Sequence, residues 1–218
     1  SIGLSTINLV EKKIQNFKPY LFSANKNYKL ICYQIKKYKP RFFIIEDLKT
    51  FKKIKKRFRY SSVNILNGFE AFNSRKKIDI TISAIPGIAG LSPTLKLIEL
   101  SKKILIANKE SIICGWNLIH RKAKKNKTLV IPIDSEHYSI LSAIKNKNLK
   151  DIKKIYITAS GGPFLNYKIN QLKKVKPTMA TRHPKWKMGK KISVDSATLM
   201  NKILELVEAQ KIFKLQDD

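Results

Sequence analysis

The chain has 218 residues and carries 45 Lys and Arg against 15 Asp and Glu, a formal net charge of +30. This length suffices for one large domain or two small ones with a buried core. Two cysteines are too few for a disulfide scaffold, and no stretch approaches the roughly 20 apolar residues that cross a bilayer. Lys12, Lys13 and Lys18 interrupt any apolar run typical of a signal peptide, so no membrane partner is expected.

Short apolar segments alternate with helix-length segments between residues 18 and 133. The expected strands are rich in Ile, Val or Phe and are bounded by polar residues, Gly or Asn. They are Tyr20–Ala24, Phe42–Glu46, Val63–Leu66, Ile78–Ile85, Ile104–Ala107 and Leu129–Ile133. Helices are expected at Lys26–Tyr38, Thr94–Ser101 and Lys109–Lys124. This alternation predicts an α/β fold with a parallel sheet, in which ligands bind at the carboxyl ends of the strands.

The composition changes after Ile133, where small, polar and acidic residues become concentrated. This change predicts a second, catalytic unit, with the boundary in the Lys-rich stretch near residues 125–130. Within that unit we expect a strand at Ile155–Ala159 and one long helix from about Val194 to Phe213.

The positive charge has two interpretations. Nucleic-acid binders usually gather Arg and aromatic side chains on one face. Here 39 of the basic residues are Lys and only six are Arg, and they are spread along most of the chain. We therefore interpret the charge mainly as background composition and expect no specific nucleic-acid partner. The run Lys52–Tyr60 is the best candidate for an exception.

The few acidic residues are more informative than the many basic ones. Asp134 and Glu136 stand two apart at the end of an apolar strand, so an extended backbone points both to the same side. Glu205 lies on the last predicted helix, one turn after Asn201. Three such carboxylates can form an all-oxygen site for Mg²⁺ or Mn²⁺. Alternatively, Asp134 caps the following helix and Glu136 lies in its first turn.

Two further segments carry groups suited to a ligand. In the turn Ser160-Gly161-Gly162, the two glycines would let backbone N–H groups approach an anion, and the Ser160 hydroxyl would add a donor. Ser196, Asn201 and Lys202 could join this site. A plain loop explains the same turn. The segment His183–Gly189 combines an imidazole, an indole and a thioether. It suits either a lid that closes on a substrate or a loop anchored by its indole.

Five motifs occur in one order along the chain. They are Ala107–Ser111, Pro132–His137, Ala159–Phe164, His183–Thr198 and Met200–Lys202. Together they closely resemble the 1-deoxy-D-xylulose 5-phosphate reductoisomerase family, over essentially the whole chain. The resemblance implies a Rossmann-like NADPH-binding domain at 1–127 and the first half of an α+β catalytic domain at 128–218.

The family's dinucleotide loop reads G-S-T-G-S-I-G, and its last three residues match Ser1, Ile2 and Gly3. The resemblance therefore implies a fragment without the family's first strand and C-terminal region. We expect such a fragment to be poorly folded or inactive alone. Two positions depart from the family pattern, because Asn25 and Ile203 stand where the family has glycine.

The activity implied by the resemblance is the isomerisation and reduction of 1-deoxy-D-xylulose 5-phosphate to 2-C-methyl-D-erythritol 4-phosphate, in the non-mevalonate isoprenoid pathway. The implied cofactors are NADPH and Mg²⁺ or Mn²⁺, with Co²⁺ as a further option. A phosphorylated sugar is the substrate, and the full-length protein is expected to be a homodimer. A bacterial cytoplasm or a plastid-like organelle is the expected location. A metal-independent NADP-dependent dehydrogenase and a basic nucleic-acid-binding protein are the alternative functions.

The resemblance also implies roles for single residues. The metal ligands would be Asp134, Glu136 and Glu205, and the catalytic residues Lys109, Glu136 and His183. The substrate would contact Lys109, Ser135, Glu136, Ser160, His183, Trp186, Ser196, Asn201, Lys202 and Glu205. The cofactor would contact Ser1, Ile2, Asn25, Lys26, Asn27, Asn108, Glu110, Met188 and Gly189.

Overall fold

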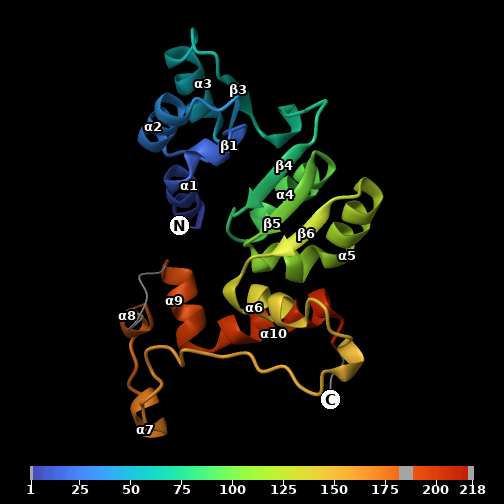
Figure 1. Cartoon of the computed structure of the whole chain (residues 1–218). Coiled ribbons are helices and arrows are strands. Elements are labelled where there is room, and N and C mark those ends of the chain that lie inside the picture. Colours follow the sequence, from blue (N-terminus) through green and yellow to red (C-terminus); the bar gives the residue numbers. More distant parts are fainter. Residues whose placement is uncertain (1, 182–188, 216–218) are drawn as a thin grey trace.

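A computed structural model describes residues 2–181 and 189–215 (Figure 1). The strands are β1 (Leu21–Ala24), β2 (Phe42–Ile45), β3 (Asn64–Asn67), β4 (Ile78–Ser83), β5 (Ser101–Ile106) and β6 (Leu129–Pro132). The helices of the first part are α1 (Ile2–Lys12), α2 (Tyr28–Tyr38), α3 (Leu48–Arg57), α4 (Leu91–Glu99) and α5 (Lys109–Asn126). Those after β6 are α6 (Ser135–Ile144), α7 (Ile169–Leu172), α8 (Pro177–Ala180), α9 (Lys190–Ala197) and α10 (Met200–Phe213). Short 3₁₀ turns occupy Ile14–Asn16, Phe69–Ala71, Ile88–Gly90 and Leu149–Asp151.

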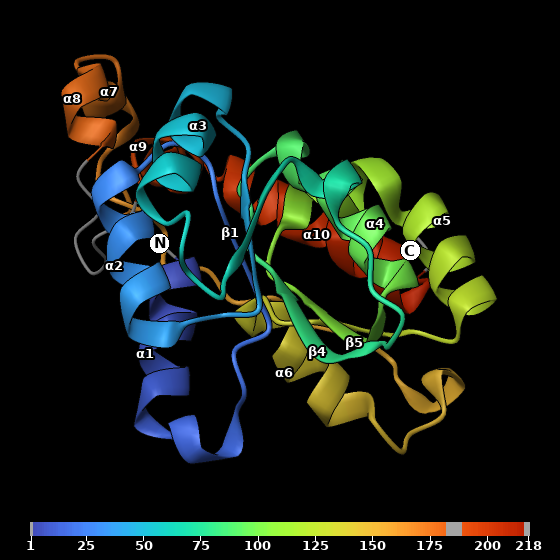
Figure 2. The same ribbon diagram turned by 90° about the horizontal axis from the view of Figure 1, so that it is seen from above.

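The strands form two parallel three-stranded sheets, ordered β1-β2-β3 and β4-β5-β6. In the first, Phe43 is paired with Phe22 and Ile65, and in the second, Ile104 is paired with Thr81 and Val130. The view from above shows the β1 unit on one side and the β4–β5 unit with α4 and α5 on the other (Figure 2). The predicted α/β fold with parallel strands is confirmed, with the strands divided between two sheets.

Strand β2 joins the two apolar clusters of the core. Phe43 and Ile45 lie on one face of β2 and pack in a cluster with the helix residues Ile35 and Ile54. Ile44 lies on the opposite face, because side chains alternate along a strand, and it belongs to a cluster centred on β5 and α5. Full burial of such β-branched and aromatic side chains supplies most of the driving force for this part of the fold.

Each of the six expected strands before residue 134 is present, with bounds shifted by a few residues. The strand expected at Ile155–Ala159 is wrong, because these residues form no ladder with any described segment. The single helix expected from Val194 to Phe213 is also wrong. It is divided into α9 and α10 at Leu199, whose φ of 60° is left-handed. The Thr198 hydroxyl donates to the Val194 carbonyl at 3.0 Å, a local bond that competes with helix continuation.

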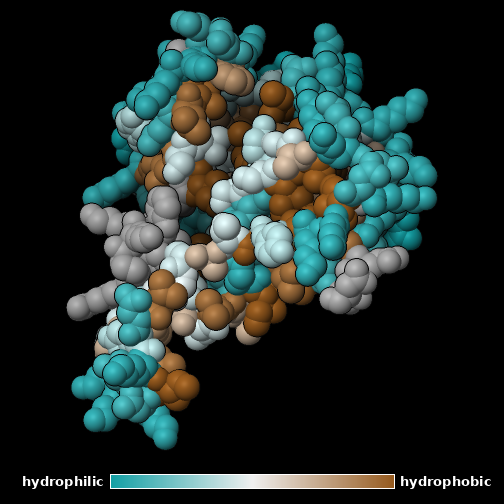
Figure 3. Space-filling model, turned by 60° about the horizontal axis from the view of Figure 1, so that its bottom comes forward, coloured by the Kyte–Doolittle hydropathy of each residue, from teal (hydrophilic) through white to brown (hydrophobic). Residues whose placement is uncertain are grey.

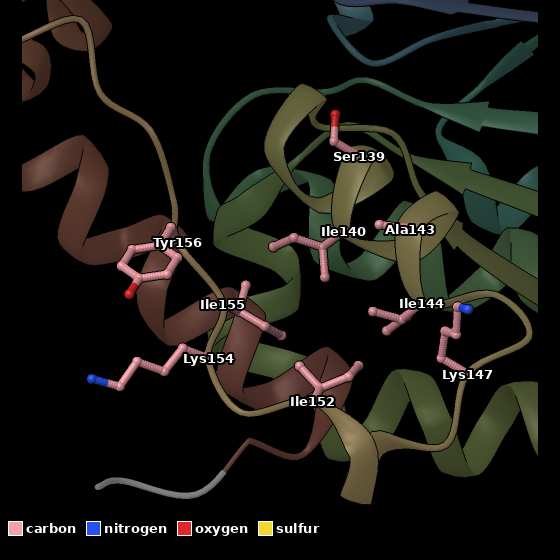
Figure 4. A pocket seen from close by; sticks show the side chains of 9 residues that line it. All are labelled: Ser139, Ile140, Ala143, Ile144, Lys147, Ile152, Lys154, Ile155 and Tyr156. Carbon is pink, nitrogen blue, oxygen red and sulfur yellow. The ribbon is translucent and has the colours of Figure 1, made fainter.

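A shallow hollow of about 400 Å³ lies between α6 and the segment that follows it. Its walls are mainly apolar, with Ile140 and Ile144 on α6 and Ile152 and Ile155 on the segment facing them (Figure 4). The view from below shows apolar surface gathered on this side of the molecule and hydrophilic surface around it (Figure 3). None of the residues implied for catalysis, metal or cofactor lines the hollow. Among the described helices, none has the length and apolar character of a membrane span.

Candidate active site

Two neighbouring strands place the first two charged groups of the site. β5 ends at Ile106 and β6 at Pro132, and these two residues are paired in the sheet. Lys109 opens α5 three residues after the end of β5, and Asp134 follows β6 by two residues. Because parallel strands end at the same edge, the two side chains meet there, with Lys109 Nζ 3.0 Å from Asp134 Oδ2.

Glu136 reaches the same edge from the first turn of α6. Asp134 is the N-cap residue of α6, so the backbone leaves the extended conformation before Glu136. The geometry expected from an extended strand is therefore wrong, and the helix-start alternative describes the backbone, although the Asp134 side chain accepts no capping hydrogen bond. The carboxylate of Glu136 accepts a hydrogen bond from Ser135 Oγ at 2.6 Å. Asp134 and Glu136 converge all the same.

Helix α10 supplies the third carboxylate. Glu205 is 2% exposed, and its Oε1 lies 2.9 Å from Lys109 Nζ. Ligand atoms of Asp134, Glu136 and Glu205 all lie within 4.8 Å of one another. These are the three residues that the resemblance implies as metal ligands. Three carboxylates gathered in this way form an all-oxygen donor set that suits Mg²⁺ or Mn²⁺.

Residues at the start of α10 complete the charge balance. Asn201 Oδ1 accepts a hydrogen bond from Lys109 at 3.0 Å, and its amide donates to Glu205 Oε1 one turn later. Lys202 Nζ is 3.0 Å from Glu136 Oε1 and also contacts Glu205 Oε2. Two ammonium groups thus lie among three carboxylates. The exposed side chain of Ile203, where the family has glycine, leaves the Asn201–Glu205 contact intact.

Burial and charge act in opposite directions on these groups. Burial raises the pKa of Asp134 despite the nearby Lys109 ammonium. Burial also acts to raise the pKa of Glu136, but hydrogen bonds from Ser135 and Lys202 outweigh it and lower that pKa to about 2. For Lys109, burial acts to lower the pKa, while the charges of Asp134 and Glu205 raise it overall. Glu136 and Lys109 are therefore charged at neutral pH.

The glycine turn at 160–162 packs against the end of α9. Gly162 has a φ of 66°, and a Cβ added there would lie 2.6 Å from the Ser196 carbonyl oxygen. The turn can approach α9 this closely only because Gly162 has no side chain. This contact brings the turn that holds Ser160 to the end of α9 that holds Ser196. Asn201 and Lys202 are assigned to the same phosphate group, but in the structure the Asn201 amide and the Lys202 ammonium both contact the Glu205 carboxylate.

The candidate cofactor residues described by the structure lie on several elements. Asn25, Lys26 and Asn27 are exposed at the carboxyl end of β1, where Asn27 Oδ1 accepts from Leu30 N at 3.1 Å and caps α2. Asn108 is 3% exposed and caps α5, while its amide donates to the Ile85 and Gly87 carbonyls. Its side chain therefore holds the loop after β4 in place. Ile2 lies exposed in α1.

An ion-pair bridge links α5 to α9. Lys191 Nζ lies 3.0 Å from Glu110 Oε1 and 2.8 Å from Asp195 Oδ2. Glu110, assigned to the cofactor, is thereby linked to α9, and Gly189, also assigned to the cofactor, is the N-cap residue of that helix. The assigned residues Ser1, His183, Trp186 and Met188 lie outside the described residues.

The sequence interpretation missed one pair of the acidic centre. His137 and Glu208 are both buried, and with Asp134 they form a second group whose ligand atoms lie within 4.8 Å of one another. Burial, and next the negative charge of Asp134, raise the pKa of Glu208 to about 8. The available signal was local: His137 follows Glu136 directly, and Glu208 lies one helical turn after Glu205.

Comparisons with known proteins agree with this geometry. The family model described as 1-deoxy-D-xylulose 5-phosphate reductoisomerase matches residues 1–115, and the model of its C-terminal domain matches residues 130–213. The reductoisomerase of Pelagibacter ubique is 46% identical over 99% of this chain, and that of Clostridium novyi is 40% identical over 100% of this chain. The chain spans 56% and 58% of the length of these two curated relatives.

Solved structures give the same result. A DOX-P reductoisomerase in complex with NADPH, fosmidomycin and magnesium matches 99% of this chain and 56% of its own chain, with a TM-score of 0.87 at 34% identity. The Zymomonas mobilis enzyme in complex with NADPH matches equally well, with a TM-score of 0.87 at 35% identity. The chain therefore belongs to the 1-deoxy-D-xylulose 5-phosphate reductoisomerase family.

Proposed function

We propose that this chain carries the cofactor-binding part and the metal site of an enzyme that converts 1-deoxy-D-xylulose 5-phosphate to 2-C-methyl-D-erythritol 4-phosphate. The proposed cofactors are NADPH and Mg²⁺ or Mn²⁺. One observation carries this proposal: the carboxylates of Asp134, Glu136 and Glu205 gather within 4.8 Å at the carboxyl ends of the strands. The complexes of related enzymes with NADPH and magnesium support it.

The donor set fits a hard divalent cation. Gathering three carboxylates, one of them nearly inaccessible to solvent, would be costly without nearby positive charge. Lys109 and Lys202 supply two positive charges against three negative ones. A divalent cation bound there would polarise substrate oxygens and stabilise the negative charge that develops during rearrangement. Asp134, Glu136 and Glu205 would hold it, and Ser135 would keep the Glu136 carboxylate oriented through its 2.6 Å hydrogen bond.

Lys109 is suited to act directly on the substrate. Its ammonium is held by Asp134, Asn201 and Glu205, so it occupies a fixed position beside the carboxylates. Because its pKa is raised, it stays charged at neutral pH and can polarise a substrate oxygen without giving up a proton. Lys109 is thus proposed as a catalytic residue, together with Glu136.

For the phosphate group of the substrate, we propose the hydroxyls of Ser160 and Ser196 as donors, with Asn201 and Lys202 beside them. The contact between Gly162 and the Ser196 carbonyl supports the pairing of turn and helix. Asn201 and Lys202 would change partners to reach the phosphate, since both contact Glu205 in the structure. His183 and Trp186 are proposed to contact the substrate from outside the described residues.

For the cofactor, we propose that Asn25, Lys26 and Asn27 meet the 2′-phosphate of NADPH. Their exposure at the carboxyl end of β1, where dinucleotides bind in parallel α/β sheets, supports this. NADPH would supply the hydride of the reduction. The other proposed contacts are Ser1, Ile2, Asn108, Glu110, Met188 and Gly189.

The proposal divides the chain at residues 127 and 128 into a cofactor-binding and a catalytic part. The positions of the two matching family models, 1–115 and 130–213, support this division. Homodimer assembly is also proposed, and light scattering would test it. The bacterial relatives support a location in a bacterial cytoplasm.

A turnover assay on the protein encoded by the complete reading frame tests the function. NADPH oxidation should require both 1-deoxy-D-xylulose 5-phosphate and Mn²⁺, and EDTA should stop it. Asp134→Asn should abolish turnover while circular dichroism stays unchanged. Asp79→Asn is the matched control, because that carboxylate pairs with Lys102 on the exposed surface of the sheet. Turnover that survives EDTA would favour a metal-independent dehydrogenase instead.

A further inference from the structure

His137 lies in the first turn of α6 and contacts α10 in three ways. Its Nε2 is 2.9 Å from the carbonyl oxygen of Glu205, and because a carbonyl only accepts, Nε2 carries the hydrogen. Its Nδ1 is 3.4 Å from Glu208 Oε2. Its ring stacks on Phe213, with 6.5 Å between ring centroids and 19° between planes. All three partners lie on α10.

The contact between His137 and Glu208 is isolated from water. The two side chains are 0% and 1% exposed, and among the described residues neither Nδ1 nor Oε2 has a hydrogen-bond partner, so each is the nearest polar group that could satisfy the other. With hydrogen on Nε2, a neutral ring offers a lone pair at Nδ1. A Glu208 carboxyl that carries its proton can donate to this lone pair. One proton at this 3.4 Å contact would satisfy both buried atoms.

This pair lies directly behind two of the candidate metal ligands. His137 follows Glu136 on α6, and its ring bonds to the backbone of Glu205 itself. Glu208 is one helical turn after Glu205 on α10. Any rotation of α6 relative to α10 would therefore change the separation of the Glu136 and Glu205 carboxylates. A fixed helix pair keeps them close before any cation binds.

We propose that His137 and Glu208 form a buried clamp between α6 and α10 that sets the spacing of the metal-binding carboxylates. Both are positioning residues. The clamp's effect on cation affinity rests on the proposed function, whereas its effect on the two helices does not. The pattern matches a general one, in which groups behind metal ligands orient them and their loss weakens metal binding about 10–100-fold.

Two readouts on the protein encoded by the complete reading frame test the clamp. The first is hydrogen exchange without added metal, which reports how firmly α6 and α10 are held. The second is Mn²⁺ affinity, measured by the loss of the free-ion EPR signal. In Glu208→Met and His137→Phe, we expect exchange of α6 amides to rise about tenfold or more, and the Mn²⁺ Kd to rise about 10–100-fold.

Two controls separate the clamp from general damage. Glu208→Gln keeps a hydrogen-bond donor for Nδ1 and should bind Mn²⁺ within about threefold of wild type. Ile54→Val removes buried volume from α3 in the other apolar cluster and should lower Tm without changing Mn²⁺ affinity. If His137→Phe does not fold, the comparison of Glu208→Met with Glu208→Gln, in α6 exchange and in Mn²⁺ affinity, still tests the clamp.

The outcomes are distinct. A wild-type protein that binds no Mn²⁺ contradicts the proposed function, and hydrogen exchange then decides on the clamp alone. Unchanged α6 exchange in a folded Glu208→Met variant overturns the clamp. A second Mn²⁺ ion per chain, lost in Glu208→Met, also overturns it, because Asp134, His137 and Glu208 would then be ligands.

Discussion

The most informative single change is Lys109→Met, which removes the ammonium from the centre of the acidic cluster. Lys109 lies 3.0 Å from Asp134, 2.9 Å from Glu205 and 3.0 Å from Asn201. Breaking a buried ion pair by removing one partner costs about 3–5 kcal/mol. Since the Lys109 and Asp134 side chains keep 16% exposure, we expect the lower end, about 3 kcal/mol of unfolding free energy without metal.

Urea unfolding of the protein from the complete reading frame measures this loss. Lys191→Met is the matched control, since Lys191 also makes two ion pairs but is 61% exposed, and we expect it to cost at most about 1 kcal/mol. Saturating Mn²⁺ should stabilise Lys109→Met more than wild type, because the ion replaces the missing charge. This reasoning is refuted if Lys109→Met lowers the free energy of unfolding no more than Lys191→Met does. It is also refuted if Mn²⁺ leaves the stability difference between Lys109→Met and wild type unchanged.

Three further predictions concern the phosphate turn, the buried glutamate and the basic surface. Gly162→Ala should destabilise the protein by about 1–3 kcal/mol in urea unfolding, since a Cβ there would meet the Ser196 carbonyl oxygen at 2.6 Å. Gly3→Ala is the control and should not cause this loss, because a Cβ at Gly3 meets no atom within 4 Å. The pKa of Glu208, raised to about 8 in the folded state, favours the folded state at low pH. In EDTA, the unfolding free energy should therefore fall as pH rises from about 4.5 to 8, and Glu208→Gln should remove part of that fall. Binding to a short DNA duplex should vanish at about 0.15 M salt, as for a generic polycation, and persistent binding that weakens on neutralising Lys52–Tyr60 would contradict this.

The parallel α/β part of the fold could be predicted from sequence because its strands are short and rich in apolar residues, most clearly in β2. Phe43, Ile44 and Ile45 have no polar neighbour within β2, so burial on both faces determines their conformation. The sheet edge where Lys109 and Asp134 meet follows from the same pattern, since each lies two or three residues after the end of a strand. What could not be predicted was the division into two sheets, which depends on pairing between distant segments.

The catalytic part was less predictable because tertiary contacts determine its local structure. The helical periodicity of residues 194–213 continues through the break at Leu199, and no local residue type forces a left-handed conformation there. The convergence of Asp134 and Glu136 was expected from a strand but arises at a helix start. The spacing of His137 and Glu208 from Glu136 and Glu205 places each beside a candidate ligand, but their contact with each other joins residues far apart in sequence and depends on the packing of α6 on α10.

The central claim is that Asp134, Glu136 and Glu205 together bind one divalent cation. A crystal of the protein from the complete reading frame, grown with Mn²⁺ and measured at the manganese absorption edge, tests it directly. The account predicts one anomalous peak per chain, within direct coordination distance, about 2.0–2.6 Å as for other hard divalent cations, of a carboxylate oxygen of each of the three residues. A peak elsewhere, or a peak at this cluster that persists in Asp134→Asn with unchanged occupancy, would contradict it.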